Sequence, residues 1–320
     1  MEKKIDIAAI GEMLIDFTQL NNTEGRITFE QNPGGAPANV LAAAGKLKKK
    51  TAIISKVGND VFGRFLKSVA EKENIDTSAL ILSDEYPTTL AFVTLDENGD
   101  RSFEFMRKSS ADVMLNADEV DDRILSSCKV FHFGSVSMTD EPSRSATLES
   151  VKKAKKAGAV ISYDPNYRQM LWASYEEALK VIPSCLEYVD VLKVADNEVS
   201  LFTEEKDIKS AAKKLLEKGP SFVFVTLGAD GCYFASKLYG SGYAKGYKVD
   251  TVDTTGAGDA FTGAALSKLI DCGFAPGKDG LSEIADFSNA AGALNTTKRG
   301  AIPAMASAEE IAEIRLRACR

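Results

Sequence analysis

The feature that most constrains this 320-residue chain is the alternation of short β-branched runs with longer segments of helical periodicity. Turn or cap residues bound each apolar run, and the runs occupy Ile5–Ile10, Thr51–Val57, Val130–Phe133, Val160–Tyr163, Val189–Val194 and Phe222–Leu227. Strand, helix and strand in succession require crossover connections, and nearly continuous apolar strands are typical of a parallel sheet covered on both faces. The sequence therefore predicts a doubly wound α/β sandwich with a mainly parallel central sheet.

Helix boundaries are marked by an N-cap aspartate, by a capping box or by a terminating glycine. The signals are Asp60 before Val61–Lys72, Asp140 before Glu141–Lys156 with Gly158 after it, Ser174 with Glu177, and Ser307 with Glu310. They predict helices between the strands and a last helix near the C-terminus.

Two stretches, residues 12–32 and 88–107, interrupt the alternation with period-two patterns and hairpin turns, one of them over Glu97–Asp100. Neither stretch alone can bury a core, so we expect them to form one small antiparallel sheet, inserted into the α/β core as a lid or a dimerisation surface. With no repeat, low-complexity tract or long linker elsewhere, residues 1–320 are predicted to be a single domain.

Charge and cysteine content exclude several function classes. Lys and Arg number 39 against 46 Asp and Glu, a net charge of −7, so we expect no general attraction to nucleic acid or to anionic membranes. The apolar run after Lys4 is too short for a signal peptide or a membrane span. The cysteines form no CxxC pair and are expected to be buried free thiols: Cys128, Cys185, Cys232, Cys272 and Cys319. These features together indicate a cytoplasmic protein.

The segment that carries chemistry is DTTGAGDAF, from Asp253 to Phe261. Gly256 and Gly258 allow backbone N–H groups to turn toward one point at the start of a helix, where the helix dipole adds positive charge. Asp259 lies in the first turn, a position that favours its ionised form. An anion hole beside a carboxylate that reaches a substrate hydroxyl is the minimum equipment for phosphoryl transfer to an alcohol. The alternative is a tight strand-to-helix turn with Asp259 as a capping residue.

Competing site motifs fit less well. The sequence contains no GxxxxGK[ST], and Phe261 stands where the third glycine of a dinucleotide fingerprint belongs, which disfavours a Rossmann dehydrogenase. His132, the only histidine, lies within an apolar run, so we expect a core or strand-end residue that cannot anchor a catalytic triad.

DTTGAGDAF resembles the C-terminal signature of the ribokinase-like carbohydrate kinases, the phosphofructokinase B family. Residues 11–17 (GEMLIDF) and 34–40 (GGAPANV) resemble the two sugar-binding segments of that family, and residues 57–63 (VGNDVFG) resemble its VGxDxFG turn. The resemblance spans essentially the whole chain. It implies the ribokinase-like fold, with ATP and Mg²⁺ as cofactors and a sugar hydroxyl as the acceptor of the γ-phosphoryl group.

The resemblance also assigns roles. Asp259 becomes the general base, and the amides of Gly256, Ala257 and Gly258 neutralise the transferring phosphoryl group. Sugar contacts are implied for Asp16, Gly34, Gly35 and Asn39. Chemically, Asp16 can accept hydrogen bonds from two vicinal hydroxyls and Asn39 offers a donor and an acceptor. The alternative makes Asp16 a strand-end residue and the two glycines part of a hairpin turn.

On the nucleotide side, residues 226–231 (TLGADG) resemble the loop that lies along ATP. The implied nucleotide contacts are Asn166, Thr226, Gly228, Gly231, Gly256, Gly258 and Asn289, although a β-turn and a polar helix position would explain the loop and Asn289 equally. The N-x-x-E element of the family is matched only by Glu198, expected to reach Mg²⁺ through water, because Ala195 stands where the asparagine belongs. Asp253 and Thr255 resemble residues of a monovalent-cation loop, which implies K⁺.

Residues 103–107 and 164–168 resemble the fructokinase and 2-keto-3-deoxygluconate kinase branches. If Arg107 and Arg168 face the sugar they suit a carboxylate; alternatively they tie the lid to the core or contact ketose hydroxyls and phosphate. Met106 and the GEMLIDF segment place D-fructose first, phosphorylated to fructose 6-phosphate, ahead of 2-keto-3-deoxygluconate and of ribose or a nucleoside. A sugar-binding regulator without turnover is the non-enzymatic alternative, and a homodimer through the lid is expected by resemblance.

Overall fold

The structure is a computed structural model that describes residues 3–20, 27–95 and 101–318. Its largest element is a nine-stranded sheet made of β1 (Ile5–Ile10), β4 (Thr51–Gly58), β5 (Ile75–Ser83), β8 (Cys128–Phe133), β9 (Val160–Tyr163), β10 (Val191–Ala195), β11 (Phe222–Thr226), β12 (Gly231–Ser236) and β13 (Ser241–Lys245). The strand order is β13-β12-β11-β10-β9-β8-β1-β4-β5. All pairings from β5 to β11 are parallel, and β12 and β13 add an antiparallel edge. The predicted mainly parallel sheet is confirmed.

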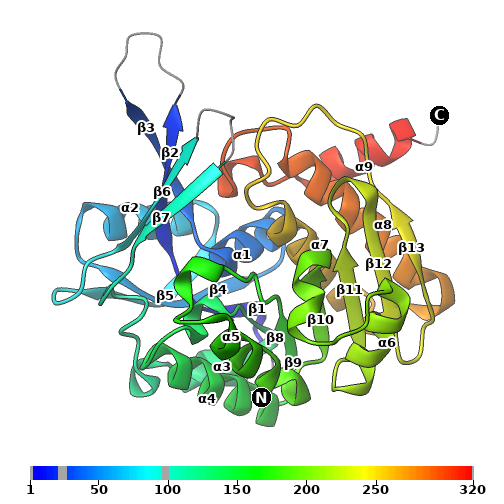
Figure 1. Cartoon of the computed structure of the whole chain (residues 1–320), viewed down its shortest axis with the longest axis horizontal. Coiled ribbons are helices and arrows are strands. Elements are labelled where there is room, and N and C mark those ends of the chain that lie inside the picture. Colours follow the sequence, from blue (N-terminus) through cyan, green and yellow to red (C-terminus); the bar gives the residue numbers. More distant parts are fainter. Residues whose placement is uncertain (1–2, 21–26, 96–100, 319–320) are drawn as a thin grey trace.

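Helices cover both faces of this sheet (Figure 1). One layer contains α1 (Ala36–Lys46), α2 (Val61–Lys72), α7 (Ala257–Asp271) and α8 (Gly277–Asn295), and the other contains α3 (Asp122–Ser127), α4 (Ser143–Lys156), α5 (Tyr175–Val181) and α6 (Ile208–Glu217). Along β1, Ile7 and Ala9 belong to the core under the first layer, whereas Ala8 and Ile10 belong to the core under the second. Burial on both sides explains why the predicted strands are continuously apolar.

The capping signals mostly hold. The Asp60 carboxylate accepts hydrogen bonds from two main-chain N–H groups at the start of α2, and Ser307 and Glu310 exchange both bonds of a capping box before α9 (Ala308–Ala318). The prediction for α4 was wrong at its start, because the helix begins at Ser143 and Asp140 is not its N-cap.

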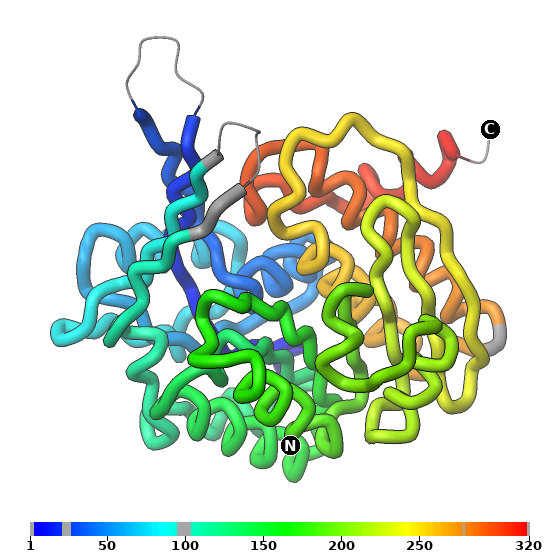
Figure 2. Tube along the Cα trace, viewed as in Figure 1, coloured from blue at the N-terminus to red at the C-terminus, as the bar shows by residue number. Residues whose placement is uncertain are grey.

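The two predicted excursions form one four-stranded sheet of order β3-β2-β6-β7, made of β2 (Leu14–Leu20), β3 (Thr28–Gly34), β6 (Thr89–Leu95) and β7 (Arg101–Met106). Two antiparallel pairs, β2 with β3 and β6 with β7, meet at a parallel pairing of β2 with β6. This lid rises from one side of the body (Figures 1 and 2). The predicted turn over Glu97–Asp100 falls entirely in residues 96–100, which lie outside the described residues.

Alternation along β2 gives the lid two different faces. Leu14, Asp16 and Thr18 line the large cavity described below, whereas Phe17 faces the other way. The Phe17 ring stacks on Phe92 of β6 at 5.2 Å and meets Phe62 of α2 edge-on at 5.7 Å. The contact with Phe62 joins the lid to the body, and the contact with Phe92 joins two lid strands, so the cavity-lining face of the lid is held over the sheet.

The site lies where the sheet reverses its direction of winding. β1 pairs with β4 on one side and β8 on the other, so a crevice opens beyond their carboxyl ends, as in other doubly wound folds. None of the helices in residues 3–20, 27–95 and 101–318 combines the length and apolar composition that a bilayer crossing requires. Among the cysteines of these residues, Cys128, Cys185 and Cys232 are buried free thiols, as predicted, and Cys272 is half-buried; Cys319 lies outside them.

Candidate active site

A cavity of about 1070 Å³ lies between the polar face of the lid, the carboxyl ends of the central strands and the N-terminus of α7. Its volume is at the upper end of the range for ligand sites, so it can hold more than one small molecule. It brings together sugar, nucleotide and catalytic residues predicted from distant parts of the sequence: Asp16, Gly35, Asn39, Asn166, Arg168, Glu198, Thr226, Gly228, Gly231, Asp253, Thr255, Gly256, Ala257, Gly258, Asp259 and Asn289.

The turn at the start of α7 is shaped by Gly256. Its φ of 81° is left-handed, and a side chain there would approach the Ala301 Cβ to 2.5 Å, so only glycine fits. The N–H of Ala257 already donates to the Thr254 carbonyl at 3.3 Å, as in a turn. Of the three amides in the predicted anion hole, those of Gly256 and Gly258 therefore stand as the main candidates to receive an anion at the helix N-terminus.

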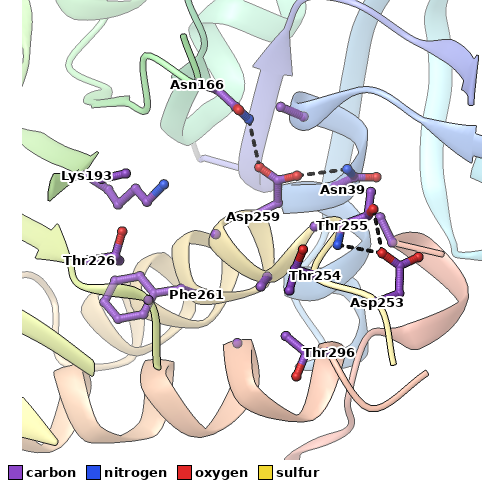
Figure 3. A pocket seen from close by; sticks show the side chains of 18 of the residues that line it. Asn39, Asn166, Lys193, Thr226, Asp253, Thr254, Thr255, Asp259, Phe261 and Thr296 are labelled. Carbon is purple, nitrogen blue, oxygen red and sulfur yellow. Dashed lines mark hydrogen bonds between the residues drawn. The ribbon is translucent and has the colours of Figure 1, made fainter. Parts of the chain in front are cut away.

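Asp259, the third residue of α7, is at the centre of the cavity (Figure 3). Its side chain is 6% exposed, and each oxygen accepts one hydrogen bond: Oδ2 from Asn39 Nδ2 at 2.8 Å and Oδ1 from Asn166 Nδ2 at 3.2 Å. Asn39 comes from α1, and Asn166 follows β9 with a left-handed φ of 47°. Two amides from separate segments thus fix the orientation of one carboxylate.

The protonation of Asp259 differs from the sequence-based prediction. Burial, followed by the nearby Asp164 carboxylate, raises the pKa of Asp259 to about 7, although Asn39, Lys193 and Arg168 oppose the rise. Desolvation thus outweighs the helix N-terminus, which alone would favour the charged form. A carboxyl group with a pKa near neutrality is suited to accept a proton during turnover.

Asp16 lies at the lid end of the cavity. Burial, together with the carboxylates of Asp253 and Asp259, raises the pKa of Asp16 to about 7, although the Arg168 guanidinium opposes the rise. Gly34 does not line the cavity; a Cβ there would lie 2.2 Å from Asp16 Oδ2, so this glycine makes room for the carboxylate. Gly34 was predicted to contact the sugar directly, and its position beside Asp16 indicates a supporting role.

Glu12, which the sequence reasoning missed, adds a second carboxyl group at this end. It is 4% exposed, lines the cavity, and accepts a hydrogen bond from Ala36 N at 2.9 Å through Oε1. Burial raises its pKa to about 7. Within the described part of the chain, Glu12 Oε2 and Asn39 Oδ1 are buried without a hydrogen-bond partner. Such atoms are rare in folded proteins, and here they lie at the walls of a cavity that can admit polar ligands.

The two arginines separate in the structure. Arg168 is exposed at the cavity rim, near enough to Asp16 and Asp259 to lower the pKa of both. Arg107 is buried outside the cavity lining: its Nε contacts Asp112 at 2.7 Å, and its terminal nitrogens donate to Thr139 Oγ1 at 2.7 Å and to the Val136 carbonyl at 3.0 Å. Arg107 therefore does not lie where the predicted direct sugar contact would place it, and the structural alternative, a tie between lid and core, describes its position.

The opposite end of the cavity is formed by the loop after β11 and by α8. Thr226 and Gly228 line it, and Gly228 has a left-handed φ of 58° with open space on its Cβ side. Gly231 fits only as glycine, because a Cβ would meet the Ala244 carbonyl at 2.2 Å. Asn289 donates from Nδ2 to that same carbonyl at 2.9 Å, so its side chain also holds β13 against α8.

Metal-binding capacity rests on few groups. Across the described residues no cluster of three or more acidic, histidine or cysteine side chains is placed to hold a metal. Glu198 lines the cavity, and its carboxylate accepts main-chain hydrogen bonds from Tyr167 at 2.7 Å and Ala195 at 2.8 Å. One fixed carboxylate together with substrate phosphates is the usual setting of Mg²⁺, so the site fits an ion that arrives with a nucleotide.

The monovalent-cation prediction falls on a turn held by side-chain hydrogen bonds. Asp253 Oδ1 accepts from the N–H and hydroxyl of Thr255, at 3.0 and 2.7 Å, and Oδ2 accepts from Gly300 N at 3.0 Å. These bonds join the segment before α7 to the loop after α8. His132, by contrast, is 1% exposed and pairs with Ser162 Oγ at 3.0 Å; burial lowers its pKa to about 4, as expected of a neutral core histidine.

The comparison with protein families shows the family to which this chain belongs. The model of the pfkB family carbohydrate kinases matches residues 4–308. This chain belongs to that family. Fructokinase-2 of Solanum lycopersicum is 42% identical over 313 residues, covering 95% of this chain and 94% of that protein. Probable fructokinase-3 of Arabidopsis thaliana is 42% identical over 308 residues, covering 93% of this chain and 88% of its own length.

Solved structures agree with the fold of this pfkB family kinase. The fructokinase of Xylella fastidiosa with bound ATP superposes with a TM-score of 0.91 at 29% identity, covering 100% of both chains. The fructokinase of Vibrio cholerae with fructose, ADP and calcium ion superposes with a TM-score of 0.87 at 30% identity, covering 97% of this chain and 99% of that one. The resemblance in the sequence motifs is thus confirmed over the whole chain, as is the ribokinase-like fold.

Proposed function

We propose that this kinase transfers the γ-phosphoryl group of ATP to D-fructose and forms fructose 6-phosphate. The observation that carries the proposal is the carboxylate of Asp259, buried in the cavity at the N-terminus of α7 and oriented by Asn39 and Asn166. The names of the similar proteins support fructose as the acceptor.

In this mechanism fructose occupies the lid end, where Asp16 and Glu12 accept hydrogen bonds from its hydroxyls and Asn39 offers its free oxygen. Asp259 accepts the proton of the reacting hydroxyl as its oxygen bonds to the γ-phosphorus and the bond to the departing ADP breaks. The amides of Gly256 and Gly258 stabilise the charge that develops on the phosphoryl oxygens. The lid excludes water, so the acceptor is the sugar rather than solvent.

The nucleotide extends from α7 past Thr226 and Gly228 toward Asn289. Mg²⁺ supplies charge neutralisation of the β- and γ-phosphates when it is bound with ATP. Glu198 would hold it through water, because both carboxylate oxygens already accept a main-chain hydrogen bond. We further propose K⁺ activation through the turn of Asp253 and Thr255, checked by comparing rates in potassium and in choline salts.

One observation favours a neutral ketose over an acid sugar. Recognition of a carboxylate by two arginines requires both to face the sugar, and Arg107 is committed to Asp112 outside the cavity lining. Arg168 remains available at the rim.

A coupled ADP-release assay with fructose, 2-keto-3-deoxygluconate, ribose and adenosine tests the proposal. We expect the highest kcat/KM with fructose. A higher value for 2-keto-3-deoxygluconate would transfer the assignment to the acid sugar, and a higher value for ribose or adenosine would transfer it to those acceptors. Binding of fructose without ADP release from any of the four would support a regulator that has lost turnover.

Three further properties belong to the proposal. We place the kinase in the cytoplasm, consistent with its free buried thiols.

We take residues 1–320 as one domain, because the lid packs on α2 through Phe17 and shares the cavity with the main sheet. We assign homodimer formation to the lid, where Ile27 and Phe29 are 71% and 36% exposed, and sedimentation of Phe29→Asp against the unaltered chain tests this.

A further inference from the structure

A lysine in the middle of the main sheet is the least expected residue in the cavity. β10 reads Val-Leu-Lys-Val-Ala, and the neighbours Leu192 and Val194 are fully buried. Lys193 itself is only 7% exposed and lines the cavity. Burial of an ammonium group is expensive, and a buried ion pair is weak evidence for a stabilising role. The position therefore calls for a functional explanation.

The ammonium group is held at the carboxyl end of the sheet by Asp164. This aspartate directly follows β9, the parallel neighbour of β10, and Lys193 Nζ lies 3.1 Å from its Oδ2 and 3.3 Å from its Oδ1. Asp164 Oδ2 also accepts a hydrogen bond from Thr262 Oγ1 of α7 at 3.2 Å. One carboxylate thus joins the lysine to the helix whose N-terminus faces the cavity.

The ammonium lies directly beside the predicted anion hole. A Cβ on Gly258 would lie 2.9 Å from Lys193 Nζ and 3.6 Å from its Cε, and apart from the adjoining backbone it would meet no other atom within 4 Å. Gly258 has no left-handed φ, so its backbone does not require glycine. Figure 3 shows the Lys193 side chain extending into the cavity toward Asp259. The second glycine of Gly-Ala-Gly therefore leaves space for this cation.

The charges around the lysine keep it protonated. Although burial alone would lower the pKa of Lys193, the carboxylates of Asp164, Glu198 and Asp259 raise it. The same three carboxylates repel a polyphosphate, and Arg168, at the rim, is exposed and screened. Lys193 is the buried positive charge among the cavity-lining residues that the structure describes.

We propose that Lys193 is a further catalytic residue, whose ammonium group contacts the γ-phosphate of ATP beside the amides of Gly256 and Gly258 while Asp164 holds it in position. The inference rests on the proposed kinase function. In the step described above the sugar oxygen bonds to phosphorus, the bond to ADP breaks and Asp259 takes the proton. Lys193 remains protonated throughout and compensates the charge on the transferring group.

The test compares two buried lysines of the same chain. Lys193→Met removes the proposed contact, and Lys56→Met is the matched control, because Lys56 of β4 is also buried, pairs with Glu119 at 2.7 Å and does not line the cavity. We expect Lys193→Met to lower kcat about 10²–10³-fold, the usual effect of removing one donor from such a hole. Lys56→Met, assayed below its melting temperature, should keep kcat within about twofold.

A binding measurement separates contact with the γ-phosphate from a structural role. By titration calorimetry, Lys193→Met should bind the non-hydrolysable analogue AMP-PNP about tenfold or more weakly than the unaltered chain, with its affinity for ADP changed less than about threefold. Because this readout needs no turnover, it holds even if the acceptor panel finds no kinase activity, and the two proposals can fail separately. Equal losses for ADP and AMP-PNP, or an unchanged kcat, would overturn the assignment of Lys193.

Gly258→Ala provides an independent variant should Lys193→Met fail to fold. Its methyl group displaces the ammonium and leaves the charge in the protein, so AMP-PNP affinity should fall with little change for ADP. In the double variant the alanine should add almost nothing to the effect of Lys193→Met, since the group that it displaces is gone. Additive effects, or an unchanged AMP-PNP affinity in Gly258→Ala, would show that the two residues do not act on one phosphate.

Discussion

The two ends of the cavity are built in different ways. At the lid end, carboxyl and amide side chains from β2, α1 and the end of β1 surround the space, and two of their buried oxygens have no partner among the described residues. At the α7 end, the main chain of a helix N-terminus and one buried lysine supply positive charge. The first arrangement is suited to select a polyol, and the second to stabilise a phosphoryl group whatever the acceptor. Changes at each end should therefore alter different kinetic constants.

The largest effect is expected where the two ends meet. Asp259→Asn keeps the size of the side chain, and Asn39 can rotate its amide to preserve a hydrogen bond, so folding should persist. Loss of the base should lower kcat about 10²–10⁴-fold. Turnover in the coupled assay measures this, with fructose and AMP-PNP binding by calorimetry as the control. A variant that keeps more than about a tenth of the activity would remove Asp259 from the role of base.

Asp16→Ala should affect the lid end alone. Loss of a buried, charged acceptor for sugar hydroxyls costs about 1–3 kcal/mol, or roughly 5–150-fold in the KM for fructose. The KM for ATP should stay within about twofold, because Asp16 lies on β2, away from the nucleotide loop. Gln19→Ala, on the opposite face of β2 and outside the cavity lining, is the matched control and should change the fructose KM little. Equal rises in both KM values would contradict the separation of the two ends.

The pH dependence follows from the raised pKa values. Asp259 must be ionised to accept a proton, and burial raises its pKa to about 7, so kcat/KM should fall about tenfold or more per pH unit below that value. Asp16, whose pKa burial also raises to about 7, titrates in the same range, so the apparent pKa belongs to the pair. A profile that stays flat down to pH 5 would contradict the assignment of either group as the active anion.

Most strands of the main sheet could be predicted from the sequence, because the signals lie within each strand and the residues that bound it. Each of the six predicted strands exists because it is apolar on both faces and bounded by turn residues. Three strands of the main sheet escaped prediction, namely β5, β12 and β13. β5 and β13 are its two edge strands and have exposed and half-buried positions, and β12 is the antiparallel neighbour of β13. The helix α1 escaped because its sequence was assigned only as a sugar-binding segment. Edge strands receive less burial than central ones, so their pattern is weaker.

Site residues could be predicted from the sequence where the residue type and its motif indicate the chemistry. They could not be predicted where the role depends on a contact that only the fold creates. Asp259 and Gly256 follow from the motif itself. For Arg107 the choice between a sugar contact and a structural tie stayed open, because the sequence does not reveal that Asp112 is the partner which neutralises it. Glu12 and Lys193 were missed, although each is a charged residue within or directly after a buried strand, a signal that could have identified them.

The smallest predicted effect is on the free energy of unfolding, because the buried carboxylate of Asp259 makes that free energy depend on pH. Burial raises its pKa from 3.8 to about 7, so between those values the folded chain binds the proton more tightly than the unfolded chain. The stabilising contribution is complete below about pH 4 and is lost as the pH rises through 7. Asp259→Asn removes that loss, so its unfolding free energy should exceed that of the unaltered chain by about 1–3 kcal/mol at pH 8 and by less at pH 5. Thermal unfolding at both pH values, with Asp118→Asn at an exposed carboxylate as control, measures the difference. A gain in unfolding free energy that is larger at pH 5 than at pH 8 would mean that the surroundings stabilise the ionised carboxylate. Attraction to neighbouring positive groups, rather than the packing of α7 against the sheet, would then keep Asp259 in the cavity.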